Sequence, residues 1–203
     1  MVDGAAPVWA DEYGFRVLAP ALPGLAGSPP VPLGEYLPSA LARIVLRDVS
    51  VRGVDRFALV GFSWGASIGA QIDPSRLRAL VSLDTGYQTY DDIPTLEERL
   101  AQFADADFAD PVVVGTAFHG VDQEPAADAL HALAEADVPI LLLVATEPFV
   151  RRRVDDLARF RERVPGAEVR EIAGGEHNLL ETSPQEVVPL VGDWLRRVTI
   201  GRA

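Results

Sequence analysis

The stretch "RFALVGFSWGASIG", residues 56–69, joins a continuous apolar run to a segment of small residues. The run at 56–61 predicts a strand that is buried on both faces, as in a parallel sheet covered by helices. Directly after it, the pattern G-x-S-x-G occurs twice in overlapping frames, around Ser63 and around Ser67. A nucleophilic serine in this pattern stands in the sharp turn between a strand and a helix. Only Ser63 meets that requirement, so we interpret it as the candidate nucleophile.

The second match lies about one helical turn further on, in the helix predicted after the turn. Small residues there would allow this helix to pack close to the sheet: Gly65, Ala66 and Gly69. We therefore interpret the match around Ser67 as a consequence of helix packing.

The rest of the chain alternates strand-like and helix-like segments. Apolar runs predict further strands at 15–22, 77–84, 138–145 and 167–173. Apolar residues at helical spacing predict helices at 33–51, 149–164 and 184–198. This alternation predicts an α/β fold in which a mostly parallel sheet is flanked by helices.

One long segment interrupts the alternation. Residues 86–137 hold helical stretches at 94–103 and 125–136 and no strong strand. We expect this segment to form a small helical cap within one domain that spans residues 1–203.

Composition excludes several classes of function. The net charge of −12 argues against binding to nucleic acid or to an anionic membrane. All 18 basic residues are Arg, which excludes Schiff-base chemistry on Lys, and the absence of Cys excludes thiol catalysis. No apolar run is long enough to span a membrane, and the acidic start does not resemble a signal peptide. We expect a cytoplasmic protein without a metal or cofactor, and the sequence does not indicate its oligomeric state.

Ligands of open parallel sheets bind beyond the carboxyl ends of the strands, so the residues that follow each strand are informative. Ser63, Asp84, Glu147 and His177 stand at four such positions. A serine, a carboxylate and a histidine in this chain order match one known arrangement of a catalytic triad. The two other histidines are expected in other roles, His119 in a structural one and His131 on a solvent-exposed helix face.

From residue 15 to about residue 198 the chain resembles the α/β-hydrolase fold family. The resemblance rests on "GFSWG" around Ser63, on "GGEHNLLETSPQEV" around His177 and on "RVLAPALPGLAGSP" at 16–29. It implies that Ser63 attacks an acyl carbon, that His177 takes and returns the proton, and that the backbone N–H of Trp64 supplies half of an oxyanion hole. The implied substrate is a small ester, thioester or related acyl compound. Apolar pocket walls are expected from Trp64, Tyr87, Phe118 and Phe149.

Two carboxylates compete for the third position of the triad. Asp84 has the usual residue type and stands at the end of a strand, where some family members carry their acid. Glu147, in "ATEPFV", occupies the commoner place, where the family typically shows Gly-x-Asp-Pro. We favour Asp84 slightly and keep Glu147 as the alternative.

The N-terminal part departs from the resemblance. Family members have a central strand ahead of the strand that corresponds to 15–22, and its His-Gly loop donates the second oxyanion N–H. Only 14 residues precede Phe15, and we expect them to hold neither that strand nor a full helix. We therefore expect a fold that lacks the N-terminal strands. The alternative function is a non-catalytic or truncated hydrolase-like protein with an incomplete oxyanion hole.

Overall fold

Four parallel strands form the centre of the protein in a computed structural model, which describes residues 4–88, 93–106, 109–147 and 155–200. The strands are β1 (Phe57–Phe62), β2 (Leu77–Leu83), β3 (Ile140–Glu147) and β4 (Glu168–Glu176). Their order in the sheet is β1-β2-β3-β4, and each neighbouring pair is parallel. The predicted parallel sheet is confirmed, with strands at four of the five predicted positions.

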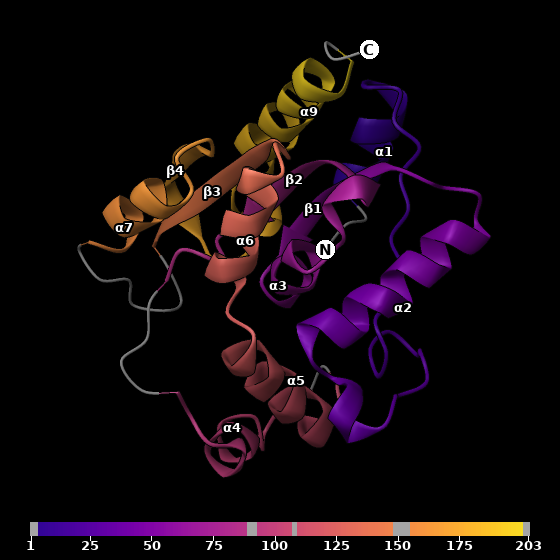
Figure 1. Cartoon of the computed structure of the whole chain (residues 1–203), viewed down its shortest axis with the longest axis vertical. Coiled ribbons are helices and arrows are strands. Elements are labelled where there is room, and N and C mark those ends of the chain that lie inside the picture. The colour runs from indigo at the N-terminus through magenta and orange to yellow at the C-terminus, as the bar shows by residue number, and fades with distance from the viewer. Residues whose placement is uncertain (1–3, 89–92, 107–108, 148–154, 201–203) are drawn as a thin grey trace.

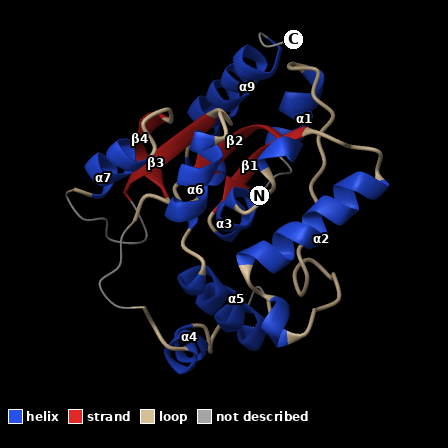
Figure 2. Cartoon of the chain, viewed as in Figure 1, coloured by secondary structure: helices blue, strands red, loops and turns tan. Residues whose placement is uncertain are grey.

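Helices cover both faces of this sheet (Figures 1 and 2). They are α1 (Ala5–Asp11), α2 (Pro38–Val51), α3 (Trp64–Ala70), α4 (Leu96–Gln102), α5 (Pro111–Gln123), α6 (Ala126–Glu135), α7 (Asp156–Arg163), α8 (Leu179–Thr182) and α9 (Pro184–Ile200). Two short 3₁₀ turns lie at Leu33–Glu35 and Pro74–Arg76. Among the described helices, none is both long and apolar enough to cross a membrane.

The side chains of the strands point alternately to the two faces of the sheet, so the core has two halves, one on each face. Leu80, Leu142 and Val144 face one side, where they pack with buried residues of α2, α3, α6 and α7. Val81, Leu141 and Leu143 face the other side, where they pack with α1, α8 and α9. Because side chains of a strand point alternately to opposite faces, one run such as "ILLLVA" serves both halves. This explains why the central strands read as continuous apolar runs.

The strand expected at 15–22 is absent, which corrects that prediction: these residues have no strand pairing. The segment is nevertheless packed, with Val17 against the half of the core that contains α9 and Leu18 against the other half. A strand requires a neighbour for its backbone hydrogen bonds. β1 pairs only with β2 in the described sheet, and residues 15–22 form no strand pairing with its other edge.

Two helices form where the sequence patterns did not indicate them. The stretch before Phe15, which we expected to hold no full helix, forms the seven-residue α1, which corrects that prediction. Trp9 of this helix is buried, and its indole N–H donates to the carbonyl of Val188 at 2.9 Å. α5 lies in the segment expected to be a cap. It packs on α4, where the guanidinium of Arg99 binds both carboxylate oxygens of Asp122 at 2.6 and 2.7 Å.

Candidate active site

Ser63 stands in a strained turn between β1 and α3. Its backbone angles are φ 49° and ψ −119°, a left-handed value of φ that residues other than glycine rarely adopt. Its carbonyl accepts hydrogen bonds from the N–H groups of Ala66 and Ser67 at 3.0 and 3.2 Å, which begin α3 immediately after the turn. The predicted strand, turn and helix around Ser63 are therefore present.

Close contact between β1 and α3 depends on two glycines. A methyl group on Gly61 would lie 2.6 Å from the Cα of Ala66, and one on Gly69 would lie 2.4 Å from a methyl carbon of Leu59. Gly65 is different, because a methyl group there would have no atom within 4 Å. The prediction of close packing is confirmed for Gly69 and wrong for Gly65.

Asp84 directly follows β2 in a second turn with left-handed backbone, φ 49°. Its N–H donates to the carbonyl of Leu143 on β3 at 2.7 Å. The hydroxyl of Ser82 donates to the carbonyl of Thr85 at 2.7 Å and closes the turn. The side chain of Asp84 is only 1 % exposed. This turn thus holds a carboxylate inside the protein at the carboxyl end of the sheet.

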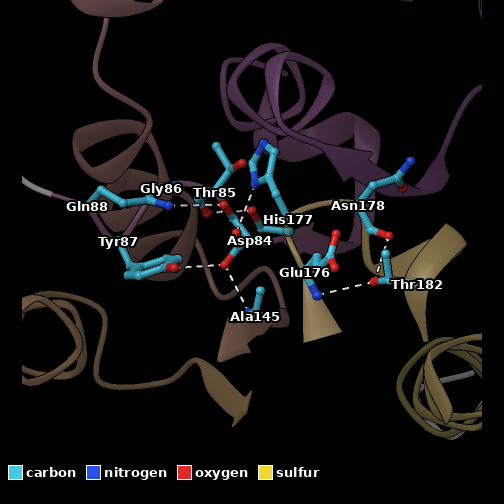
Figure 3. A network of polar contacts seen from close by, with 11 residues as sticks. Asp84, Thr85, Gly86, Tyr87, Gln88, Ala145, Glu176, His177, Asn178 and Thr182 are labelled. Carbon is cyan, nitrogen blue, oxygen red and sulfur yellow. Dashed lines mark hydrogen bonds and ion pairs between the residues drawn. The ribbon is translucent and has the colours of Figure 1, made fainter. Parts of the chain in front are cut away.

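The carboxylate of Asp84 contacts the imidazole of His177. Nδ1 of His177 donates to Oδ2 of Asp84 at 2.8 Å (Figure 3). The other oxygen, Oδ1, accepts from the hydroxyl of Tyr87 at 2.7 Å and from the backbone N–H of Ala145 at 2.9 Å. Nδ1 therefore carries a proton when the ring is neutral, and Nε2, which points away from Asp84 in Figure 3, has a lone pair that can accept one.

The turn that carries His177 is held by a threonine from α8. The hydroxyl of Thr182 accepts from the N–H of Glu176 at 3.2 Å and donates to the carbonyl of Asn178 at 3.1 Å (Figure 3). These two backbone groups flank His177 on both sides. Thr182 lies in the stretch "GGEHNLLETSPQEV", but no sequence pattern pointed to this role.

The imidazole of His177 also packs on β1. Its ring centroid lies 4.7 Å from that of Phe62, with an interplanar angle of 55°. Phe62 directly precedes Ser63, so this contact sets the histidine beside the serine turn. The carboxyl ends of β1, β2 and β4 thus bring Ser63, Asp84 and His177 to one region.

The remaining predicted residues have different surroundings. Glu147 is exposed at the end of β3. Phe118 packs on Phe103, which directly follows α4, with ring centroids 4.5 Å apart. Trp64 is half-buried beside Tyr36, and its indole nitrogen is buried without a hydrogen-bond partner among the described residues. Phe149 lies outside the described residues.

Tyr87, expected as a pocket wall, is buried at 2 % exposure, and its hydroxyl donates to Asp84.

The two other histidines lie on helices away from the contact between Asp84 and His177. His131 is half-buried on α6, where its Nδ1 lies 2.7 Å from the carbonyl of Arg163, and His119 lies on α5 with a buried Nδ1. Within the described ranges, no three His, Cys, Asp or Glu side chains gather closely enough to hold a metal ion.

Known structures resemble this fold over most of its length. A thermophilic esterase from Thermogutta terrifontis matches with a TM-score of 0.78 and 20% identity, over 96% of this chain and 85% of the esterase. A carboxylesterase structure from Nitrososphaera gargenis matches with a TM-score of 0.72 and 16% identity, over 98% and 88% of the two chains. The N-acyl homoserine lactonase AidH matches with a TM-score of 0.65 and 15% identity, over 96% and 86%.

A search of curated proteins found no match. The sequence profile of the Alpha/beta hydrolase family, in contrast, matches residues 5–190, which is most of the chain. The parallel sheet flanked by helices is consistent with this match. The protein belongs to the alpha/beta hydrolase family.

Proposed function

We propose that the protein is a serine hydrolase that cleaves a small ester, thioester or related acyl compound. The observation that carries the proposal is the 2.8 Å hydrogen bond between Asp84 and His177, whose imidazole lies against the residue preceding Ser63. A buried carboxylate, an imidazole and a serine in a strained turn are the groups that acyl transfer requires.

In the proposed reaction the hydroxyl of Ser63 attacks the acyl carbon, and Nε2 of His177 takes the hydroxyl proton. The imidazolium returns this proton to the leaving alcohol or thiol, and an acyl-enzyme remains on Ser63. Water then attacks the acyl-enzyme with His177 as base, which releases the acid and restores Ser63. Asp84 keeps the proton of the neutral ring on Nδ1 and stabilises the imidazolium.

The negative charge on the acyl oxygen needs hydrogen-bond donors. We assign one to the backbone N–H of Trp64, because it directly follows Ser63 at the start of α3, where N–H groups have no partner within the helix. The half-buried indole of Trp64 would line the acyl pocket. Phe118 and Phe149 stay proposed walls on the sequence pattern alone.

The substrate class is supported by the similar structures. The Thermogutta protein is an esterase, the Nitrososphaera proteins are carboxylesterases, and AidH is a lactonase acting on an N-acyl homoserine lactone. At 15–20% identity these likenesses concern the fold, and what they share supports the ester members of the proposed substrate class.

Hydrolysis of p-nitrophenyl butyrate tests this proposal. We expect turnover by the wild-type protein, and a loss of at least about 10³-fold in kcat for Ser63→Ala. Ser67→Ala is the matched control: it removes the same hydroxyl one helical turn away, from a side chain that is 1 % exposed. Equal activity in Ser63→Ala and the wild type would contradict the proposal.

A second candidate function is a hydrolase-like protein without catalysis. It is favoured by the position of β1, which is an outer strand in the described sheet and leaves no neighbouring strand there to donate a second oxyanion N–H. The loss of one such donor costs about 10²- to 10³-fold in rate. Complete absence of turnover in folded protein, across short acyl esters, would favour this candidate.

A further inference from the structure

We infer that Tyr87 is a positioning residue for Asp84 rather than a wall of the substrate pocket. The inference rests on the proposed function and extends it to a residue that touches neither the substrate nor Ser63. Tyr87 lies three residues after Asp84, and its hydroxyl donates to Oδ1 of Asp84 at 2.7 Å (Figure 3).

The two oxygens of this carboxylate have separate partners. Oδ2 accepts from His177, whereas Oδ1 accepts from Tyr87 and from the N–H of Ala145. The phenol hydroxyl and the backbone N–H therefore hold Oδ1 and leave Oδ2 for the imidazole. A carboxylate fixed in this way cannot rotate without breaking a hydrogen bond on each oxygen.

The backbone turn around Tyr87 also restricts the position of its side chain. Tyr87 is 2 % exposed and belongs to the core cluster that contains α3 and α6. The side chain of Gln88 donates to the carbonyl of Asp84 at 3.0 Å and accepts from the N–H of Gly86 at 3.2 Å. Gly86 has φ 92°, and a methyl group on it would lie 2.6 Å from Leu130. The phenol thus comes from a turn with few alternative conformations.

Loss of this hydroxyl affects catalysis through orientation. With one donor fewer on Oδ1, Asp84 can turn, and a larger share of His177 rings is misaligned for taking the proton of Ser63. This reduces the rate of the chemical step. Substrate binding should not change, because the side chain of Tyr87 is buried.

The test is Tyr87→Phe, which keeps the ring and removes only the hydroxyl, assayed with p-nitrophenyl butyrate. We expect kcat to fall about 10-fold with KM unchanged within about twofold. Tyr13→Phe is the matched control: it removes a hydroxyl that donates to the carbonyl of Pro189 at 3.2 Å against α9, and kcat should not change.

Unfolding in urea, measured on both variants, separates a structural role from a positioning role. A merely structural Tyr87 would give a less stable protein with wild-type kcat in its folded fraction, and this result would overturn the inference. A rise in KM at constant kcat would overturn it as well and return Tyr87 to the pocket. Absence of turnover in the wild type would overturn the proposed function and this inference together.

Discussion

Asp84 and His177 are joined by a 2.8 Å hydrogen bond although 93 positions separate them in the sequence. Asp84 lies at the end of β2 and His177 at the end of β4, two strands away across β3. Glu147, at the end of β3, is closer to His177 in the chain but is exposed to solvent. The histidine therefore pairs with the carboxylate inside the protein.

This pairing predicts the effects of two substitutions. Asp84→Asn should lower kcat by about 10⁴-fold, because the amide cannot stabilise the imidazolium and favours the wrong tautomer of His177. Glu147→Gln should leave kcat within about twofold. Steady-state kinetics on p-nitrophenyl butyrate check both. If only the Glu147 substitution abolishes turnover, the assignment of Asp84 as the acid is wrong.

Substitution of Gly61 and of Gly65, the glycines on either side of Ser63, should have opposite effects on the stability of the protein. Gly61→Ala places a methyl group 2.6 Å from the backbone of Ala66, so β1 and α3 must separate; we expect a loss of about 2 kcal/mol and much reduced activity. Gly65→Ala meets open space within a helix and should stabilise the fold by up to about 1 kcal/mol. Urea unfolding of the two variants measures this difference. Equal destabilisation by both would contradict the close contact at Gly61.

Much of the site was predictable because residues after parallel strands meet at one edge of the sheet. The run at 56–61 and the serine pattern located Ser63, and the strand at 167–173 located His177. The choice between Asp84 and Glu147 was not predictable, because it depends on burial and on a hydrogen bond across the sheet. The proposed role of Tyr87 was not predictable either, because it depends on burial of the side chain and on the hydrogen bond from its hydroxyl to Asp84.

The differences between the predicted and the observed fold also have physical causes. Residues 15–22 have a strand-like pattern, yet pattern alone supplies no pairing partner. α5 is a helix that the sequence patterns did not indicate, and it contains a run of valines, which favour strands over helices. Its start signals were nevertheless present, with Pro111 in the first turn and Asp110 accepting from the N–H of Val112 at 2.8 Å.

Acid should weaken the contact between β4 and α9. Burial alone would raise the pKa of the Glu168 carboxyl, but hydrogen bonds and charge from Arg197 and Arg170 outweigh burial and hold this pKa below its ordinary value. A lowered pKa means that the ionised carboxylate stabilises the folded state above about pH 4.5, and that this contribution is lost as the pH falls through the lowered pKa.

Glu168→Gln should therefore lower the free energy of unfolding by about 1 kcal/mol at pH 7, a modest value because the side chain is partly exposed. The difference from the wild type should shrink as the pH falls below about 4.5, and it should approach zero once the pH lies below the lowered pKa. Urea unfolding at pH 7, 5 and 3.5 measures it. A difference that stays constant over this range would show that charge on Glu168 does not contribute.

Covalent labelling tests whether Ser63 is an activated nucleophile. A fluorophosphonate probe is incubated with the folded wild type, Ser63→Ala and Ser67→Ala, and the intact masses are measured. We predict a single adduct on the wild type and on Ser67→Ala, located by peptide mapping at Ser63, and none on Ser63→Ala. Labelling of Ser63→Ala to the wild-type extent, or a folded wild type that is not labelled, would show that Ser63 is not the nucleophile.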